Sequence, residues 1–433
     1  MKTLKEKLAQ KIEEHRPRTV KLLKEYGDKK VGEISITQAI GGARGVRMLV
    51  TDISYLDPFE GIRFRGYTIP ETLEALPKPE GKKYPYVEGF WHLLLTGEIP
   101  TMEETLALVE DFKQRSEVPA YVFDVLKAMP EDSHPMTMFS TAILAMQKES
   151  KFVKFYQTEY DKMKAWESTY EDSTDILARL PEIAAFIYRF KYKDGDIIAK
   201  NPNEDMGGNF AHMMGIDLPY DDVARMYFIL HSDHESGNAS AHTTHLVSST
   251  LSDPYYSLSG GMNALAGPLH GLANQETLRW LQGVMDKLDG KEPTEEMMKE
   301  FVWETLNSGQ VIPGFGHAVL RKTDPRYQEQ REFCLENLPD DKIFKYVDML
   351  YRVVPDILVE QGKAKNPWPN VDAQSGVIQW YYGITEYDFY TVMFGVGRAI
   401  GVLANITWDR ALGYPIERPK SLTTAMLEEI AKK

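Results

Sequence analysis

The sequence predicts a mainly α-helical protein with a small β element near its N-terminus. Apolar residues recur at helical spacing along most of the chain, whereas segments that alternate like strands are few and short. The strand and helix alternation of a doubly wound sheet is absent, as are the Walker and dinucleotide glycine fingerprints. Because 433 residues exceed what one hydrophobic core usually supports, we expect two domains.

The β element is expected first along the chain. Residues 31–36, 47–55 and 61–66 are the strand candidates, and a glycine-rich loop at 41–45 separates the first two. Thr101 and Glu104 form a capping box that begins a helix ending near Arg115. Amphipathic spacing predicts further helices at 90–96, 121–128, 136–149, 152–166, 175–192, 221–232, 295–306, 343–361 and 387–408.

Glycine loops near Gly271 and Gly383 are the best domain boundaries. They give a large domain of residues 1–271 and 383–433 and a small domain of residues 272–382. Residues 236–275 carry a single charge, Asp253, among many serines, threonines and histidines. Such a segment is unsuited to lipid and fits closely packed helices inside a large protein or across a subunit interface.

Composition excludes several classes of protein. The net charge of -14 argues against nucleic-acid partners, which bind through cationic surface. Cys334 is the only cysteine, so an intrachain disulfide and a thiolate zinc cluster are excluded and a reducing compartment is expected. The first residues include Glu6, Glu13 and Glu14 and resemble neither a signal nor a transit peptide. We therefore expect a cytoplasmic protein, or a mitochondrial-matrix protein if the chain is a processed form.

Three loops each place one acid or base group in a backbone of restricted geometry. His317 ends the segment PGFGH, His270 lies within GPLHG, and Asp372 ends NPWPNVD. Glycine frees the backbone to aim a side chain, and proline stiffens its approach. The aromatic surroundings of Asp372 would desolvate its carboxylate and strengthen it as a base. Simpler interpretations are tight turns for the two histidines and an N-cap of a helix at 377–381 for Asp372.

Three arginines suit a carboxylate ligand, because a guanidinium donates two parallel hydrogen bonds. They lie in polar or small-residue contexts and are Arg326, Arg398 and Arg418. Each could instead be an ordinary surface residue. Arg398 is the strongest candidate, because its helix is otherwise apolar and its charge needs a partner there.

Four histidines, at 231, 234, 242 and 245, would share one face of an unbroken helix. Eleven residues of helix span ~16 Å, so the two pairs cannot hold one ion, and Gly237 is expected to break the helix between them. Without an HExxH motif we expect no metal site, and interpret His231, His242 and His245 as hydrogen-bonded core or interface residues. His234 differs, because the polar residues that follow it could open it to a ligand.

Four long motifs closely resemble those of citrate synthases, and they occur in the family's order. They are HSDHE at 231–235, AGPLHGLANQE at 266–276, PGFGHAVLR at 313–321 and PWPNVD at 367–372. The likeness extends from residue 61 to residue 421 and is greatest to the mitochondrial-type branch. It implies a two-domain helical homodimer whose mobile small domain binds CoA and closes over the substrates. The implied activity is that of a citrate (Si)-synthase, which condenses acetyl-CoA with oxaloacetate and water without a metal or other cofactor.

The resemblance also implies roles for residues that match the family's motifs. Asp372 would remove a proton from the acetyl methyl group, His270 would hydrogen-bond the thioester oxygen, and His317 would protonate the oxaloacetate carbonyl. The dicarboxylate would be held by His234, Arg326 and Arg398, with Arg418 contributed by the other protomer. Contacts to CoA are expected from Arg44, Arg321, Lys363 and Lys365.

Two residues depart from the family's usual pattern, Gln374 where relatives often have histidine and Ser236 where they often have glycine. Both flank site residues and bear on rate or substrate preference. Three alternatives stay open at this point. They are a 2-methylcitrate synthase that uses propionyl-CoA, a histidine-metal hydrolase, and a non-catalytic CoA-binding protein.

Overall fold

The computed structural model describes residues 2–289 and 291–432, and it is mainly helical as predicted. Its one described sheet is small and lies near the N-terminus, with strands β1 (Ser54–Asp57), β2 (Gly61–Phe64) and β3 (Tyr67–Thr68). The strands are antiparallel in the order β1-β2-β3, with Ser54 opposite Phe64.

The helices follow one another along the rest of the chain. Before residue 200 they are α1 (Leu4–Tyr26), α2 (Ile36–Ile40), α3 (Ile69–Ala75), α4 (Val87–Thr96), α5 (Met102–Arg115), α6 (Ala120–Lys127), α7 (Pro135–Ala145), η1 (Met146–Glu149), α8 (Lys151–Thr158) and α9 (Ala165–Tyr192). After it they are α10 (Met206–Met214), α11 (Tyr220–Leu230), α12 (Ala239–Ser249), α13 (Pro254–Leu265), α14 (Ala273–Leu288), α15 (Glu295–Asn307), α16 (Pro325–Asn337), α17 (Lys342–Gln361), α18 (Asp372–Tyr381), η2 (Tyr387–Phe389), α19 (Tyr390–Leu412) and α20 (Thr424–Ala431).

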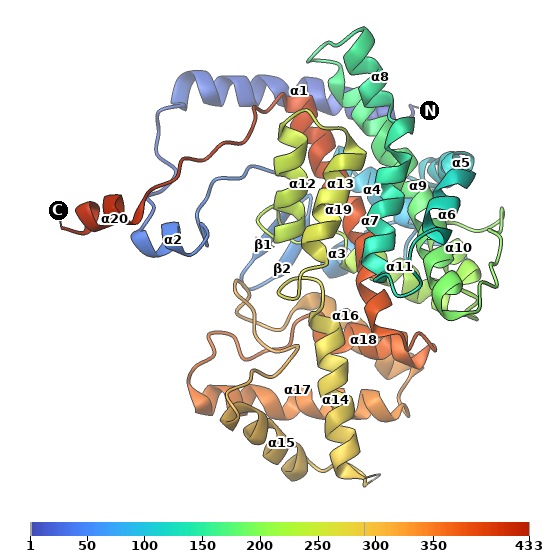
Figure 1. The fold of residues 1–433 in the computed structure, drawn as a ribbon, viewed down its shortest axis with the longest axis vertical. Coiled ribbons are helices and arrows are strands. Elements are labelled where there is room, and N and C mark those ends of the chain that lie inside the picture. Colours follow the sequence, from blue (N-terminus) through green and yellow to red (C-terminus); the bar gives the residue numbers. More distant parts are fainter. Residues whose placement is uncertain (1, 290, 433) are drawn as a thin grey trace.

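Helix α19 is the centre of the larger group of helices (Figure 1). Nearly all of its residues are buried, and it packs against α4, α9, α11, α12 and α13. Glycines let neighbours approach it closely: a Cβ at Gly397 would lie 3.1 Å from the backbone oxygen of Phe228. Together with η2, it is the one stretch in the described residues long and apolar enough to cross a membrane, and its apolar part is wholly buried.

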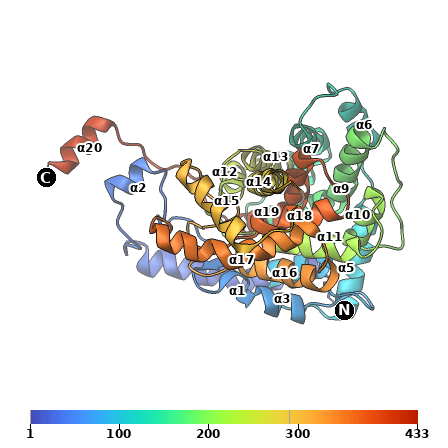
Figure 2. The same ribbon diagram turned by 90° about the horizontal axis from the view of Figure 1, so that it is seen from below.

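Helices α14 to α18 lie together at one end of the molecule, as both views show (Figures 1 and 2). Helix α14 packs on α18, α15 on α17, and α16 on both α18 and α3. His270 lies just before α14, His317 lies between α15 and α16, and Asp372 is the first residue of α18, so all three stand at or near the ends of these helices.

Two terminal segments project from the body on the same side (Figure 1). One contains α2 and the other ends in α20. Large apolar side chains on them are exposed, including Ile40, which is 72% exposed, and Met426, which is 50% exposed. Apolar surface of this kind is typical of a segment that packs on another chain.

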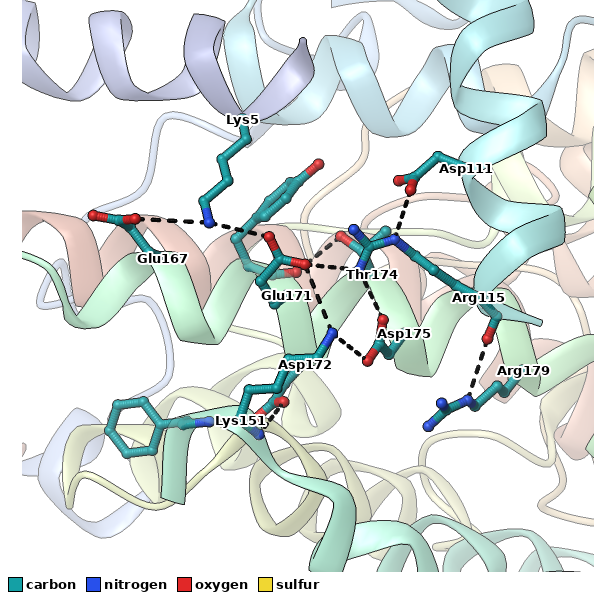
Figure 3. A network of polar contacts seen from close by, with 12 residues as sticks. Lys5, Asp111, Arg115, Lys151, Glu167, Glu171, Asp172, Thr174, Asp175 and Arg179 are labelled. Carbon is teal, nitrogen blue, oxygen red and sulfur yellow. Dashed lines mark hydrogen bonds and ion pairs between the residues drawn. The ribbon is translucent and has the colours of Figure 1, made fainter. Parts of the chain in front are cut away.

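A buried and half-buried charge network ties α1, α5, α8 and α9 together (Figure 3). Arg115 is its centre and pairs with Asp111, Glu171 and Asp175 at 2.7 to 2.8 Å. Lys5 of α1 joins through Glu171 at 3.1 Å. The network anchors the N-terminal helix to α9, which in turn packs on α19.

Three of the expected elements are wrong. Residues 31–36 form no strand, because no neighbouring strand pairs with them, and Ser35 instead caps the short helix α2. Within 47–55 only the last two residues enter β1. The helix expected at 152–166 is broken between Thr158 and Ala165, where the Asp161 side chain accepts a hydrogen bond from the Met163 backbone in a turn. The capping box at Thr101 and the other predicted helices are present, with shifted ends.

Candidate functional site

The loops that carry His317 and Asp372 are joined backbone to backbone. The Gly316 N–H donates to the Trp368 carbonyl at 2.9 Å, and the Asn370 N–H donates to the Gly314 carbonyl at 2.9 Å. Gly314 has a φ of +77° and Gly316 a φ of +91°. A Cβ at Gly314 would lie 2.7 Å from the Ala373 Cα. The glycines predicted to aim the histidine are therefore required both by the turn and by this close approach.

His317 is held as a neutral hydrogen-bond donor. Its Nδ1 accepts hydrogen bonds at 3.0 Å from the Val319 and Leu320 backbone N–H groups. Burial first, and then the charge of Arg326, lower the pKa of His317 to about 4. At neutral pH the ring is uncharged and its single proton is on Nε2, which leaves that nitrogen as a donor.

His270 is neutral with the opposite tautomer. Its Nε2 accepts a hydrogen bond from the Ser240 backbone N–H at 3.1 Å and lies 2.9 Å from the Ser240 hydroxyl. Burial first, and then Arg398, lower the pKa of His270 to about 4. The proton is therefore on Nδ1, the nitrogen that the protein does not use.

Asp372 is the first residue of α18 and is partly buried. Burial raises the pKa of its carboxyl to about 6, although Arg326 and Arg398 oppose the rise. The interpretation of Asp372 as an N-cap is not borne out, because Val371 occupies the cap position and no side-chain cap bond forms. A carboxylate with a pKa near 6 is ionised at pH 7 and above, and is a stronger base than an ordinary aspartate.

Two buried arginines and a histidine form a cationic, hydrogen-bonding pocket beside these groups. The His234 and His317 rings lie 5.2 Å apart, edge to face. Burial first, then Arg326, His317 and Arg398, lower the pKa of His234 well below its usual value. Arg326 and Arg398 are 4% and 1% exposed. The structure therefore brings His234, Arg326 and Arg398 near the three acid and base groups.

The partners of the two arginines were missed by sequence reasoning. Arg326 forms a bidentate pair with Asp324, two residues before it, at 2.7 to 3.2 Å. Arg398 donates to the Asn238 side chain at 2.7 Å and to the Ser240 hydroxyl at 3.3 Å. Asn238 is also the N-cap of α12, which was the one local signal that could have identified it.

The four clustered histidines do not form a metal site. Helix α11 ends at Leu230 and α12 begins at Ala239, so the helix is broken around Gly237 as predicted. His242 bonds Glu417 at 2.7 Å, and His245 bonds Asp409 at 2.6 Å. Within residues 2–289 and 291–432, no group of three or more histidine, cysteine, aspartate or glutamate side chains is arranged to hold a metal ion.

Five of the predicted substrate-binding residues lie outside the group of acid, base and arginine side chains, or hydrogen-bond other parts of the chain. Arg418 is exposed at the root of the projecting C-terminal segment, and Arg44 is exposed after α2. Lys363 and Lys365 are exposed after α17. Arg321 lies near enough to lower the pKa of His317, and its guanidinium donates to the carbonyls of residues 318–320 at 2.8 to 3.3 Å.

The two residues that depart from the family's pattern bond side chains other than the reacting groups. Gln374 is buried and donates to the Cys334 sulfur at 3.1 Å, on the side of α18 that faces α16. Ser236 is buried against Asn405 of α19 at 3.5 Å. Both residues therefore contribute to the packing of the helices that carry the site.

Comparison with known proteins extends over almost the whole chain. The family described as citrate synthase, C-terminal domain, matches residues 42–420. The mitochondrial citrate synthase of Saccharomyces cerevisiae is 52% identical over 432 residues, which are 100% of this chain and 90% of that protein. Mitochondrial citrate synthase 4 of Arabidopsis thaliana is 50% identical over 99% of this chain and 91% of its own. The solved citrate synthase of Pyrobaculum aerophilum is 27% identical with a TM-score of 0.76, covering 92% of this chain and 95% of that one.

One solved structure of the same fold holds ligands. It is described as the ternary complex of carboxymethyl coenzyme A and oxaloacetate with the citrate synthase of Thermoplasma acidophilum. Its TM-score is 0.74 at 21% identity, over 90% of this chain and 97% of that one. At that identity it supports the fold alone.

The expectation of a cytoplasmic protein is contradicted by these relatives. Those from yeast, Arabidopsis, Xiphias gladius and Daucus carota are all named as mitochondrial enzymes. The few acidic residues of the N-terminal segment were a weak basis for that expectation, because they do not report the compartment of the protein.

The relatives also do not favour the three alternatives of a propionyl-CoA enzyme, a metal hydrolase and a non-catalytic CoA-binding protein. The chain therefore belongs to the citrate synthase family and catalyses the condensation of acetyl-CoA, as co-substrate, with oxaloacetate to give citrate and CoA, without a metal or other bound cofactor.

Proposed function

We propose that Asp372, His270 and His317 are the catalytic groups of this condensation. Asp372 takes a proton from the acetyl methyl group, and His270 donates its Nδ1–H to the thioester oxygen as the enolate forms. The new carbon nucleophile attacks the oxaloacetate carbonyl carbon, whose oxygen receives a proton from His317 Nε2. Water then hydrolyses the citryl-CoA thioester to citrate and free CoA. The observation that carries this assignment is the pair of opposite tautomers, each with its free N–H on the nitrogen not bonded to the protein.

The electrostatics of the site support these roles. A thioester α-proton is a very weak acid, so its removal needs both a strengthened base and a donor already in place for the oxyanion. Asp372, with a pKa raised to about 6, supplies the base. The neutral imidazoles supply donors that need no proton uptake at neutral pH.

The dicarboxylate substrate fits the neighbouring cationic pocket. Arg326 and Arg398 are buried side by side with His234, and both arginines shift the pKa of that histidine. Each guanidinium can donate two parallel hydrogen bonds to one carboxylate of oxaloacetate. Asp324 holds Arg326 in place, and Asn238 with Ser240 holds Arg398.

The base assignment is tested by Asp372→Asn, which keeps size and removes the negative charge. CoA release from acetyl-CoA plus oxaloacetate, followed with a thiol reagent, should fall at least about a hundredfold, because base catalysis typically contributes 10²–10⁴ in rate. Asp356→Asn is the matched control, since Asp356 is exposed on α17, and it should keep wild-type turnover. Turnover of Asp372→Asn within tenfold of wild type would remove the proposed base.

The active enzyme is a homodimer in which Arg418 reaches the partner's oxaloacetate pocket. The exposed position of Arg418 and the projecting segments with exposed apolar side chains support this arrangement. It is tested by mixing inactive Arg418→Ala and Asp372→Ala chains after denaturation and refolding. If the arginine acts in trans, half the dimers are mixed and each has one complete site, so about one quarter of wild-type activity returns. No recovery in demonstrably mixed dimers would place Arg418 in its own chain's site.

Residues 272–382 form a small domain that binds CoA and closes over the substrates. The separate grouping of α14 to α18 and the exposed Lys363 and Lys365 support this (Figure 1). Closure excludes water and protects the thioester, so oxaloacetate binds first. Replacing both lysines with alanine should raise KM for acetyl-CoA and leave KM for oxaloacetate unchanged, and Arg44 and Arg321 are tested in the same way. The relatives named as mitochondrial support the mitochondrial matrix as the compartment, which organelle fractionation would test.

A further inference from the structure

We propose that Glu417 is a positioning residue for the partner's oxaloacetate pocket, because its bonds to helix α12 fix the backbone from which Arg418 extends. The inference rests on the proposed role of Arg418 in trans, and it names the contacts that aim that arginine. From the sequence, His242 and His245 were interpreted only as hydrogen-bonded core or interface residues, and Glu417 was not singled out.

Arg418 lies in a segment without helix or strand. Helix α19 ends at Leu412 and α20 begins at Thr424, and the chain between them runs away from the body of the molecule (Figure 1). Ile416 is 59% exposed, and Arg418 is exposed as well. Because a free backbone has many conformations, an arginine on such a segment is aimed only if the backbone beside it is held.

Glu417 is held on α12 through both its backbone and its side chain. Its N–H donates to the Ser249 hydroxyl at 3.0 Å, and its Oε1 accepts a hydrogen bond from His242 Nε2 at 2.7 Å. Its Oε2 lies 3.6 Å from His245 Nε2. The side chain is 13% exposed, although the residues on both sides of it are exposed. Among the described residues from 415 to 422, Glu417 alone hydrogen-bonds another part of the chain.

The two histidines that face Glu417 share one face of α12, since they are three residues apart. His245 Nδ1 also lies 2.6 Å from the Asp409 carboxylate of α19, so this ring stands between two carboxylates. The hydrogen bond to Asp409 first, and then the charges of Asp409 and Glu417, raise the pKa of His245, while burial opposes the rise. A protonated His245 has an N–H on each nitrogen, one toward Asp409 and one toward Glu417.

These contacts fix the point from which the Arg418 side chain starts. Consecutive Cα atoms lie about 3.8 Å apart, so holding Glu417 restricts the position of the Arg418 Cα. A segment that is ordered before the substrate arrives does not lose that freedom on binding. Helix α12 also carries Asn238 as its N-cap and Ser240 in its first turn, and both bond Arg398. One helix therefore supports its own chain's pocket at one end and holds the segment of Arg418 at the other.

The test is the affinity of the dimer for oxaloacetate, measured by titration calorimetry. Glu417→Ala should weaken binding at least about fivefold, because a misplaced Arg418 loses part of its hydrogen bonding to the substrate. Arg418→Ala should weaken binding at least about tenfold, the value of one hydrogen bond between charged groups. In the Arg418→Ala background, Glu417→Ala should add less than about twofold, because both changes remove the same contact.

Three further variants complete the set. Glu417→Gln keeps an oxygen that accepts the His242 N–H, so its affinity should stay within about twofold of wild type. Glu117→Gln is the matched control: it removes a carboxylate from an exposed pair with Lys200, at 3.1 Å, and should bind like wild type. Ser249→Ala removes only the acceptor of the Glu417 N–H. It should weaken binding in the same direction as Glu417→Ala, and it decides the question if Glu417→Ala does not assemble.

Mixed dimers distinguish aiming in trans from a general structural defect. In a purified dimer of one Glu417→Ala chain and one Asp372→Ala chain, the one complete site combines Asp372 of the first chain with Arg418 of the second. The second chain has an intact Glu417. The KM of this site for oxaloacetate should therefore return to within about twofold of wild type, whereas the Glu417→Ala homodimer keeps a raised KM.

The outcomes separate the two claims. A raised KM that persists in the mixed dimer would make Glu417 merely structural and overturn the inference. Wild-type affinity of the Glu417→Ala homodimer, or a full additional loss in the Arg418→Ala background, would also overturn it and leave Arg418 as a ligand. Wild-type affinity of Arg418→Ala would instead defeat the proposed role of Arg418 itself, and the inference with it.

Discussion

Position 401 of α19 has no room for a methyl group. A Cβ there would lie 2.4 Å from the Ser232 carbonyl oxygen and 2.5 Å from the Asp233 Cβ. Ser232 and Asp233 immediately precede His234, which is proposed to bind oxaloacetate. The substitution Gly401→Ala must therefore shift either the core helix that carries Arg398 or the segment that carries His234.

Neither side can move freely. Asp233 is fully buried, and its carboxylate accepts hydrogen bonds from the Ser54 hydroxyl at 2.6 Å and from the Asn405 amide at 3.2 Å. Overpacking of this kind costs about 1–3 kcal/mol of stability. Alanine in place of glycine returns up to about 1 kcal/mol of helix propensity. The net effect of Gly401→Ala is thus a loss of up to about 2 kcal/mol.

Gly283 provides the opposite case in another helix. It is exposed on α14, and a Cβ there would meet no atom within 4 Å. Gly283→Ala should therefore stabilise the protein by up to about 1 kcal/mol. At about 2.1 cal/mol/K per residue, unfolding this chain changes entropy by roughly 0.9 kcal/mol/K, so 1 kcal/mol corresponds to about 1 °C in Tm.

The two variants, Gly401→Ala and Gly283→Ala, are compared with wild type by calorimetry, which gives Tm at one protein concentration, and by steady-state kinetics on the same samples. Gly401→Ala should lower Tm by up to about 2 °C and raise KM for oxaloacetate several-fold, since positioning errors of even 1 Å at a binding site are costly. Gly283→Ala should raise Tm by up to about 1 °C with unchanged KM. A Gly401→Ala enzyme as stable as wild type with unchanged KM would refute the close-packing argument.

Three further outcomes are expected. Arg225→Ala should destabilise the protein by about 3–5 kcal/mol in urea unfolding, because it removes the ion-pair partner of buried Asp205, whereas Asp221 keeps its pair with Lys82. Arg279→Ala, which breaks an exposed pair, should cost under about 1 kcal/mol. Cys334 should react with a thiol reagent only after unfolding, since burial raises the pKa of its thiol; rapid labelling of the native enzyme would contradict this. Burial and Asp205 raise the pKa of Glu88 to about 8, so between pH 4.5 and 8 Glu88 is protonated in the folded protein and ionised in the unfolded chain, and stability falls as pH rises. Glu88→Gln should therefore lessen the fall in Tm from pH 5 to pH 7.5. An unaltered dependence of Tm on pH in this variant would argue against the raised pKa of Glu88.

The site could be found in the sequence because its backbone requirements are local. Gly314 and Gly316 must adopt positive φ to aim His317, and a motif of glycines around a histidine makes that visible without any structure. Arg398 stood out for a similar reason, because a charge in an apolar helix needs a partner.

The hydrogen-bond partners of Arg398 could not be predicted from the sequence, since they are far from it in the chain. Asn238 and Ser240 bond Arg398 across 160 and 158 residues. Residues 31–36 looked like a strand from their composition and form none, because a strand needs a neighbour and the folded chain offers none.

The sequence by itself determined the helical class and the family, and it singled out the three acid and base groups and the arginines as candidates, since each of these depends on local periodicity or on contiguous motifs. Only the tertiary structure decided which nitrogen of His270 and His317 is free to donate, why the pKa of Asp372 is raised, and which buried groups enclose it. Those properties arise from desolvation and from hydrogen bonds between distant segments, and they exist only once the chain has packed.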